Sequence, residues 1–199
     1  MDAVDRRAIA DALRERARGM REDACEGFDE APELDPLVTE PAYYQPDSFP
    51  GSIEEQLDRL AGSAGIVVVD DGQVLCTEIG YKDGWMTPGG AQDPGETLAE
   101  TAVREVYEET NIEAEITGIF YHRDFAYDYG HDELIRIPLV VYTGRKVGGR
   151  RAAPAHKVPS GEPEITDVDW FGPEELPENM LDRERIRDLL VEHDGEDDR

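Results

Sequence analysis

The sequence predicts a mixed α/β or α+β domain preceded by a helical extension. Segments rich in β-branched residues predict strands, and longer segments with helical periodicity lie between them. The chain has 199 residues, of which 39% are hydrophobic, which suits one domain plus an extension. We expect a helical extension with a proline-rich tether over residues 1–62, the compact domain over 63–193 and a frayed tail over 194–199.

The extension should contain two helices joined by an extended tether. Residues 1–27 are dense in charge and show a modest helical periodicity. Five prolines lie between residues 29 and 51, and each removes a backbone donor and restricts the residue before it. Ser52 and Glu55 fit a capping box, which predicts a short helix over Ile53–Leu60.

The compact domain should begin with a hairpin. Asp71-Gly72 is a turn signal between two apolar segments, Gly65–Asp70 and Gln73–Ile79. The same patterns predict strands at Ile112–Tyr121, Glu133–Thr143 and Glu164–Phe171, and helices at Leu98–Thr110, Pro173–Leu176 and Asp182–Glu192.

Acidic residues dominate the charge of the chain. It has 47 Asp and Glu against 20 Lys and Arg, a formal net charge of −27. Self-repulsion of this size strains the compact state in dilute buffer, whereas in molar salt the Debye length of about 3 Å screens it. The composition therefore favours a protein of a salt-rich, halophilic cytosol over an ordinary acidic protein. It also disfavours stable binding to nucleic acid, which is itself a polyanion.

The sequence shows no run that is apolar enough for a membrane span or a signal peptide. We therefore expect a soluble, cytoplasmic protein. The two cysteines, Cys25 and Cys76, can form neither a disulfide framework nor a paired-cysteine metal site.

The segment from Gly89 to Ile112 carries the chemistry. Glu105, Glu108 and Glu109 share one face of the expected helix, where three carboxylates repel one another. Such a face is either solvated, which is the usual outcome in so acidic a chain, or used to hold a cation. The double glycine before it allows a ligand close to the backbone, and hard oxygen ligands suit Mg²⁺. These neighbouring features favour the cation site.

The same segment resembles the Nudix box. It reads Gly90-x5-Glu96-x7-Arg104-Glu105-Val106-Tyr107-Glu108-Glu109-Thr110-Asn111-Ile112, against G-x5-E-x7-R-E-U-x-E-E-x-G-U, where U is apolar. Every fixed position matches except Asn111, where the family has the glycine that closes the helix. Asparagine is the next-best residue in a left-handed conformation. The similarity extends around the box, from the Trp85-x-x-Pro88 lead-in to the Glu164–Pro177 segment, but not to residues 1–60.

The resemblance implies an α/β/α sandwich with a mixed central sheet. It also implies a pyrophosphohydrolase that uses water to split a nucleoside diphosphate linked to another group. The substrate would be a small nucleotide: ADP-ribose, a nucleotide sugar, a dinucleotide polyphosphate or a modified nucleoside triphosphate. The alternative is a catalytically silent module that senses a nucleotide, but the box carboxylates are intact and favour the enzyme. Many relatives dimerise, which leaves a homodimer open.

Residue by residue, the resemblance implies a metal site on the helix. Glu105, Glu108 and Glu109 would bind Mg²⁺ or Mn²⁺, with the carbonyl of Gly89 as a further ligand. The metal would neutralise the pyrophosphate oxygens and lower the pKa of the attacking water.

The resemblance also implies the remaining catalytic roles. Arg104 would orient the glutamates through an ion pair with Glu96. The general base would be Glu105 or a distant acid, for which Glu164 and Glu162 are the candidates. The alternative for Glu164 is a simple charge at a strand edge.

Two stretches outside the box are candidates for choosing the substrate. Tyr121–Asp132 contains Arg123, Tyr127 and Tyr129, which can stack on bases or bind phosphate. In the family, some diadenosine polyphosphate hydrolases carry a tyrosine there and some ADP-ribose hydrolases a proline. The tyrosines thus point towards dinucleotide polyphosphates, although aromatic side chains also simply pack.

The second stretch is Gly144–Gly161, which holds a quarter of the basic residues. Arg145 and Arg151 are its candidate phosphate contacts, because guanidinium groups pair well with phosphate. The alternative is the tip of a hairpin with no part in binding.

Overall fold

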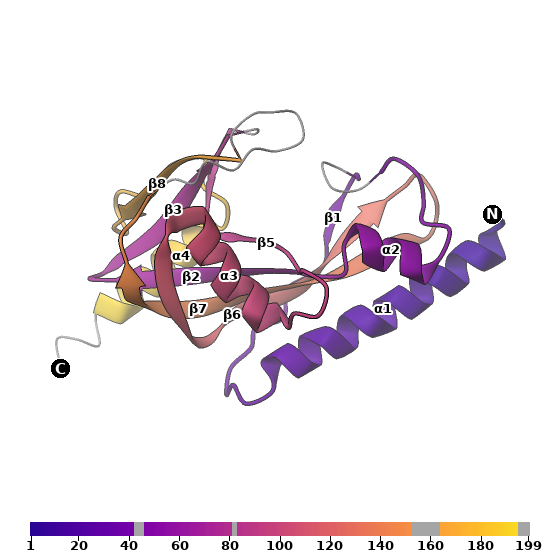
Figure 1. The fold of residues 1–199 in the computed structure, drawn as a ribbon, viewed down its shortest axis with the longest axis horizontal. Helices are drawn as coiled ribbons and strands as arrows, with labels where there is room; N and C mark the ends of the chain where they lie inside the picture. The colour runs from indigo at the N-terminus through magenta and orange to yellow at the C-terminus, as the bar shows by residue number, and fades with distance from the viewer. Residues whose placement is uncertain (42–45, 81–82, 153–163, 195–199) are drawn as a thin grey trace. The chain divides into compact units, whose positions relative to one another are not determined.

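The computed structural model describes residues 1–41, 46–80, 83–152 and 164–194 (Figure 1). Within these ranges four helices and eight strands follow one another along the chain. The helices are α1 (Ala3–Cys25), α2 (Ile53–Arg59), α3 (Leu98–Thr110) and α4 (Arg183–Asp194). The strands are β1 (Leu37–Thr39), β2 (Ser63–Asp70), β3 (Gln73–Ile79), β4 (Trp85–Met86), β5 (Gly89–Ala91), β6 (Ile112–Asp128), β7 (Leu134–Gly149) and β8 (Ile165–Phe171).

The strands form one mixed sheet in the order β1-β6-β7-β2-β3-β4, with β5 paired to β2 and β8 paired to β3. β1 runs parallel to β6, whereas β3 runs antiparallel to β2, β4 and β8. The predicted mixed α/β class with an N-terminal helix is thereby confirmed. None of the helices in the described ranges is both long and apolar enough to cross a membrane.

The described chain forms two compact units. The first unit comprises Met1–Ala64, Gly90–Thr101 and Gly118–Val141. The second comprises Gly65–Gly89, Ala102–Thr117 and Tyr142–Arg199.

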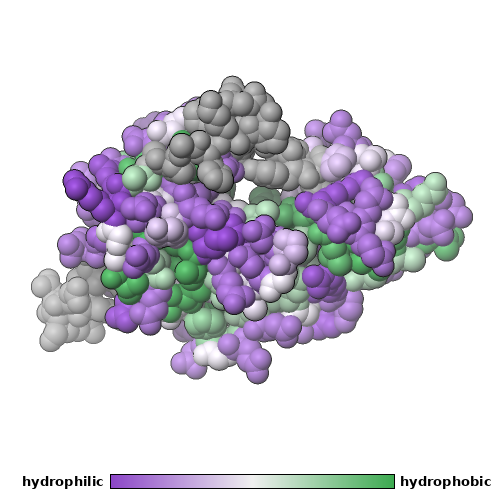
Figure 2. Space-filling model, in the orientation of Figure 1, coloured by the Kyte–Doolittle hydropathy of each residue, from purple (hydrophilic) through white to green (hydrophobic). Residues whose placement is uncertain are grey.

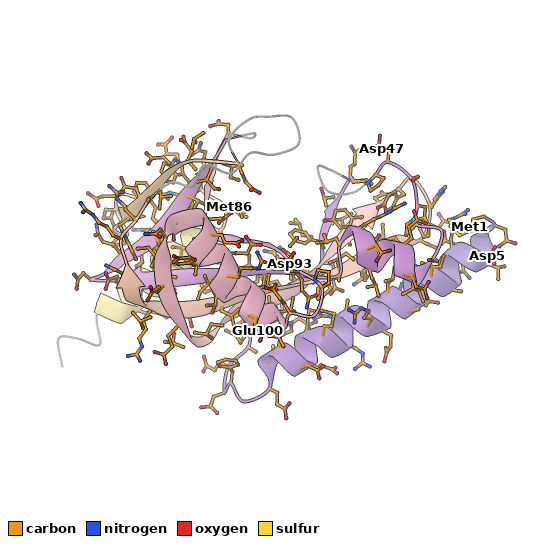
Figure 3. The ribbon with its side chains drawn as sticks, in the orientation of Figure 1. Met1, Asp5, Asp47, Met86, Asp93 and Glu100 are labelled. Atoms are coloured by element: carbon orange, nitrogen blue, oxygen red, sulfur yellow. The ribbon has the colours of Figure 1, made fainter. Side chains whose placement is uncertain are left out.

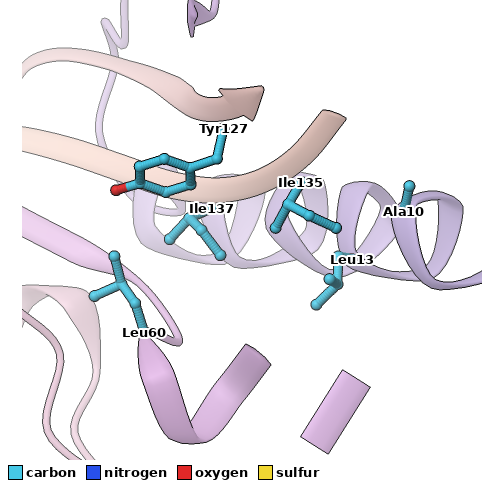
Figure 4. Close-up of a cluster of buried hydrophobic side chains, with 6 residues drawn as sticks. All are labelled: Ala10, Leu13, Leu60, Tyr127, Ile135 and Ile137. Carbon is cyan, nitrogen blue, oxygen red and sulfur yellow. The ribbon is translucent and has the colours of Figure 1, made fainter. Parts of the chain in front are cut away.

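The first unit has its core between α1 and the strands β6 and β7. The buried residues of α1 recur three or four positions apart, which places them on one face of the helix. That face packs against β-branched and aromatic side chains of the two strands (Figure 4). The cluster consists of Ala10, Leu13, Leu60, Tyr127, Ile135 and Ile137.

A buried ion cluster also fastens α1. The Nε of Arg21 lies 2.8 Å from Oδ1 of Asp124 on β6, and Arg136 of β7 lies 3.3 Å from the other oxygen of Asp124. The Asp124 side chain is only 2% exposed. A buried carboxylate requires such partners, because an unpaired charge in the interior is very costly.

Part of the expected tether is a strand. Leu37–Thr39 pairs in parallel with Phe125–Tyr127 as β1, and the Leu34 N–H donates to the carbonyl of His122 at 2.9 Å. The prolines leave enough residues between them for this short edge strand, and proline is tolerated beside edge strands.

The second unit places the glycine loop next to β2. Ile66 donates its N–H to the carbonyl of Pro88 at 3.0 Å. At Gly65 an added Cβ would lie 3.0 Å from that same carbonyl, so a larger residue would push the two segments slightly apart. Below the loop, the rings of Trp85 and Phe171 meet edge to face at 4.9 Å. The loop that leads into Gly89 is therefore fixed on the sheet.

Three expected boundaries are wrong. β6 continues to Asp128 instead of ending at Tyr121, and β7 continues to Gly149, because a long paired ribbon lets each strand supply the other's backbone bonds. The helix expected at Pro173–Leu176 is a turn, in which Glu175 donates its N–H to the carbonyl of Gly172. Four residues followed by a proline are too short to propagate a helix. The predicted frayed tail lies outside the described residues from 195 onwards.

Candidate active site

Helix α3 begins with a capping box that its sequence encodes. The N–H of Glu100 donates to the hydroxyl of Thr97 at 3.2 Å, and the N–H of Thr97 donates back to the Glu100 carboxylate at 2.8 Å. Glu100 at this helix end and Asp93 in the preceding loop are labelled in Figure 3. Ala102 and Val106 are fully buried. The first turn and the apolar face thus fix which way the remaining side chains point.

Glu109 connects the helix to the glycine loop. Its Oε2 accepts a hydrogen bond of 3.1 Å from the N–H of Gly89. The residue retains some exposed area, but enough protein surrounds its carboxyl group that desolvation raises its pKa well above the ordinary value. The charges of Glu105 and Glu164 raise this pKa further, and the Gly89 hydrogen bond opposes them.

Arg104 holds the two other box carboxylates. Its Nη1 lies 2.8 Å from Oε1 of Glu105 and 2.9 Å from Oε2 of Glu108. The Glu105 side chain is 14% exposed, and that of Glu108 is 50% exposed. Burial raises the pKa of Glu105, and the hydrogen bond from Arg104 lowers it in part. The guanidinium nitrogen therefore lies between two carboxylates as a cation would.

The donor chemistry of this cluster fits a hard divalent cation. Its groups are carboxylate oxygens and the backbone of Gly89, which are the ligands that Mg²⁺ prefers. Among the described residues, however, no three His, Cys, Asp or Glu side chains are close enough together to hold a metal ion in this conformation. In this conformation the same nitrogen of Arg104 donates to both Glu105 and Glu108.

Glu164 lies next to this cluster, immediately before β8. Its backbone carbonyl accepts a hydrogen bond of 2.8 Å from Gly80, and its charge raises the pKa of both Glu105 and Glu109. Glu162, the other candidate base, lies outside the described residues. The second unit thus brings Gly89 and Glu164 together with the glutamates of α3.

Glu96 lies in the first unit, in the loop before α3. Its Oε2 accepts hydrogen bonds from the N–H of Asp93 at 3.2 Å and from the hydroxyl of Thr101 at 3.0 Å. These bonds shape the loop into the helix. The ion pair between Glu96 and Arg104 stays a prediction.

The three candidate substrate residues of the first unit are engaged in packing. Arg123 places its guanidinium 4.9 Å from the centre of the Tyr121 ring. Tyr127 is 8% exposed within the core, and burial raises its pKa to about 12. Tyr129 meets Phe49 edge to face at 5.7 Å. Substrate contacts by these residues remain predictions, and the position of Tyr127 in the core favours the packing alternative for it.

The two candidate arginines of the second unit form surface ion pairs. Arg145 lies 2.6 Å from Glu115 on the neighbouring strand. Arg151 pairs with Asp169 and donates to the carbonyl of Val168 at 2.7 Å. Their role in binding phosphate also remains a prediction.

Asn111 makes a contact that could not be predicted from the sequence. Asn111 ends α3 with φ of +58°, as expected for the position where the family has glycine. In addition, its Nδ2 donates a hydrogen bond of 2.7 Å to the carbonyl of Arg150. A polar side chain at a helix end signals a cap, but it does not reveal a partner far along the chain.

Known proteins match most of this chain. The model of the NUDIX domain family matches residues 59–190. A MutT-like protein from Streptomyces ambofaciens is 32% identical over 132 residues, which cover 66% of this chain and 75% of that protein. The Nucleoside diphosphate-linked moiety X motif 6 protein of Mus musculus is 36% identical over 74 residues. That match covers 37% of this chain and 23% of the mouse protein, so the chain spans only about a quarter of this relative.

The fold also matches solved structures. The crystal structure of a NUDIX hydrolase from Nitrosomonas europaea superposes with a TM-score of 0.51 at 19% identity. The match covers 67% of this chain and 71% of that one. At this identity the likeness shows the shared fold alone.

Proposed function

This chain belongs to the NUDIX domain family of pyrophosphohydrolases, and on that premise we propose that it uses Mg²⁺ or Mn²⁺ to split a phosphoric anhydride bond in a nucleoside diphosphate linked to another group. The observation that carries the proposal is the contact between Glu109 and Gly89. It joins a partly buried carboxylate to the glycine loop, and the charges of Glu105 and Glu164 act on that carboxylate. A divalent cation would relieve the repulsion between these acidic groups.

Glu105, Glu108 and Glu109, with the carbonyl of Gly89, would hold the metal. The bound ion would neutralise pyrophosphate oxygens and lower the pKa of the attacking water. Arg104 would position Glu105 and Glu108, to which it is already paired. Its guanidinium must shift as these carboxylates turn towards an ion.

We assign the general base to Glu164 rather than to Glu105. Glu105 is ion-paired with Arg104 and is one of the proposed metal ligands, so its oxygens are already engaged, whereas Glu164 is not among those ligands. Glu164 would take the proton from the attacking water as the new P–O bond forms and the anhydride P–O bond breaks. A general base within hydrogen-bonding reach contributes about 10²–10⁴-fold to the rate.

The residues that would choose the nucleotide stay predictions from the family resemblance. Tyr129 and Arg123 present an aromatic face and a guanidinium group, which suit a base and a phosphate. The preference for dinucleotide polyphosphates that the tyrosines suggest therefore rests on Tyr129 alone, since Tyr127 is packed in the core. ADP-ribose, nucleotide sugars and modified nucleoside triphosphates are the other candidates.

The net charge indicates the salt concentration and the kind of partner that suit this protein. A net charge of −27 suits a salt-rich cytoplasm, and hydrophilic residues prevail on the face drawn in Figure 2. The same charge disfavours a nucleic-acid partner. A homodimer stays a prediction from the family resemblance.

The test is a screen of phosphate-linked nucleotides with Mg²⁺ or Mn²⁺ in high salt, with identification of the products. We expect one nucleotide class to be hydrolysed only when the metal is present. Products labelled from ¹⁸O-water would show which phosphorus is attacked. Nucleotide binding without turnover would instead support a silent sensing module.

A further inference from the structure

The C-terminal end of α3 contacts three residues that follow β7. These residues, Arg150–Ala152, form the clasp. The carbonyl of Arg150 accepts the 2.7 Å hydrogen bond from Nδ2 of Asn111. The N–H of Ala152 donates to the carbonyl of Thr110 at 2.9 Å. The end of the helix that carries the box glutamates is therefore bonded to the clasp from two successive residues.

The chain is tightly packed where the clasp begins. Gly149 has φ of +81°, and an added Cβ there would lie 3.0 Å from the N–H nitrogen of Glu113 and closer still to the carbonyl oxygen of Asn111. A side chain at this position would push the end of β7 away from the helix turn. Two features therefore keep Asn111 next to the clasp: its side-chain hydrogen bond and the close packing at Gly149.

The clasp reaches β8 in the other direction. Nη1 of Arg151 donates to the carbonyl of Val168 at 2.7 Å and pairs with Asp169. β8 begins directly after Glu164. Three consecutive residues therefore join the helix of Glu105 and Glu109 to the strand that follows Glu164.

We propose that Asn111 is a positioning residue, which through the clasp sets the distance between the glutamates of α3 and Glu164. Glycine, the family residue at this place, would satisfy the positive φ but has no side chain to donate to Arg150. Asparagine thus adds a connection between the metal-binding glutamates of α3 and Glu164, the proposed base. The proposal rests on the proposed function, because it gives Glu164 a part in hydrolysis.

Two substitutions separate the backbone role of Asn111 from its side-chain role. Asn111→Gly keeps the left-handed conformation and removes the donor. Asn111→Asp keeps the size and tolerates the same φ, but its carboxylate cannot donate to a carbonyl. Glu113→Gln is the matched control, because this exposed residue follows the same turn and has no hydrogen bond to the clasp in the described structure.

The first measurement is hydrogen exchange at the backbone amide of Ala152 in the full-length protein. Both Asn111 variants should exchange about two- to tenfold faster than the wild type, as expected when one neutral hydrogen bond is lost. Glu113→Gln should not. This readout needs neither metal nor turnover. Unchanged exchange in both Asn111 variants would overturn the proposal.

The second measurement is the kinetics of hydrolysis. Both variants should lower kcat about two- to tenfold and leave KM unchanged. In a Glu164→Gln background, Asn111→Asp should cause no further fall, because the residue acts through Glu164. An equal fall in both backgrounds, or no fall at all, would show a merely structural contact. A wild-type chain without turnover, combined with faster exchange in the variants, would support the clasp and refute the proposed function.

Discussion

The backbone N–H of Gly89 donates a hydrogen bond of 3.1 Å to the carboxylate of Glu109. This bond ties the glycine loop to the C-terminal end of the acidic face of α3. It offsets part of the desolvation that raises the pKa of Glu109, and it orients one carboxylate oxygen towards the loop. In the proposed site, this contact would hold a glycine of the box next to one of its glutamates.

Replacement of Glu109 tests this site directly. Glu109→Gln retains a carbonyl oxygen that can accept from Gly89, so the fold should persist, but it removes the charge that would bind the metal. We expect most turnover to be lost in Glu109→Gln and in Glu108→Gln, with at least about a tenfold higher Mg²⁺ concentration needed for half-maximal activity. Metal titrations of the hydrolysis rate measure this.

The control for both is Glu113→Gln, which removes one acidic charge just beyond the helix. It should retain wild-type activity, and circular dichroism should show that all three variants are folded. Full activity in both Glu108→Gln and Glu109→Gln would refute the proposed metal site.

Local patterns predicted the elements that depend on neighbouring residues. The bounds of Leu98–Thr110 and Gln73–Ile79 are confirmed, because a capping box, a helical period and a turn signal each act within a few residues. The capping residue Thr97 and its partner Glu100 lie three positions apart in the sequence.

Contacts between distant parts of the chain could not be predicted in this way. The pairing of β1 with β6, and that of Arg21 with Asp124, join residues that no local period connects. The same holds for the bond from Asn111 to Arg150. A single sequence carries no signal for such pairs, because Asp124 follows His122 and Arg123 in a strand that also contains other charged residues.

The basic residues Arg145 on β7 and Arg151 just after it offer a test of substrate binding. If Arg145 contacts a phosphate, Arg145→Ala should raise KM about fivefold, which corresponds to about 1 kcal/mol, and leave kcat unchanged. The double variant with Arg151→Ala should raise KM further. Steady-state kinetics on the nucleotide found in the screen decides this. An unchanged KM in the double variant would contradict a role of these two arginines in binding the substrate.

The buried ion cluster of the first unit offers a test of stability. Asp124→Ala leaves Arg21 and Arg136 without their shared carboxylate, and it should reduce the free energy of unfolding by about 3–5 kcal/mol. Asp11→Ala is the matched control, because it breaks the exposed 3.2 Å pair with Arg14 and should cost less than about 1 kcal/mol. Denaturant unfolding in high salt measures both. Equal losses in the two variants would contradict the buried role of Asp124.

The ion pair between Arg6 and Glu133 gives a prediction for pH. Arg6 lies 3.1 Å from Glu133 and lowers the pKa of this carboxyl group. A depressed pKa in the folded state means that the stabilisation is complete above the unfolded pKa of about 4.3 and is lost as the pH falls through the folded pKa. The free energy of unfolding should therefore fall less between pH 5 and pH 3 in Glu133→Gln than in the wild type. The difference is the contribution of this one carboxyl group to the pH dependence. Identical pH profiles would show that this pair does not contribute.

The net charge of −27 gives the last prediction, which concerns salt. Raising the salt concentration from about 0.1 M to about 1 M shortens the Debye length from about 10 Å to about 3 Å, so repulsion between the surface carboxylates falls steeply. The free energy of unfolding and the hydrolysis rate should both increase over this range. Thermal unfolding is measured in KCl and, as a control, in sucrose. Sucrose is excluded from the protein surface but does not screen charge, so the comparison separates screening from preferential exclusion. A protein that is equally stable and active in dilute buffer would refute adaptation to a salt-rich cytoplasm.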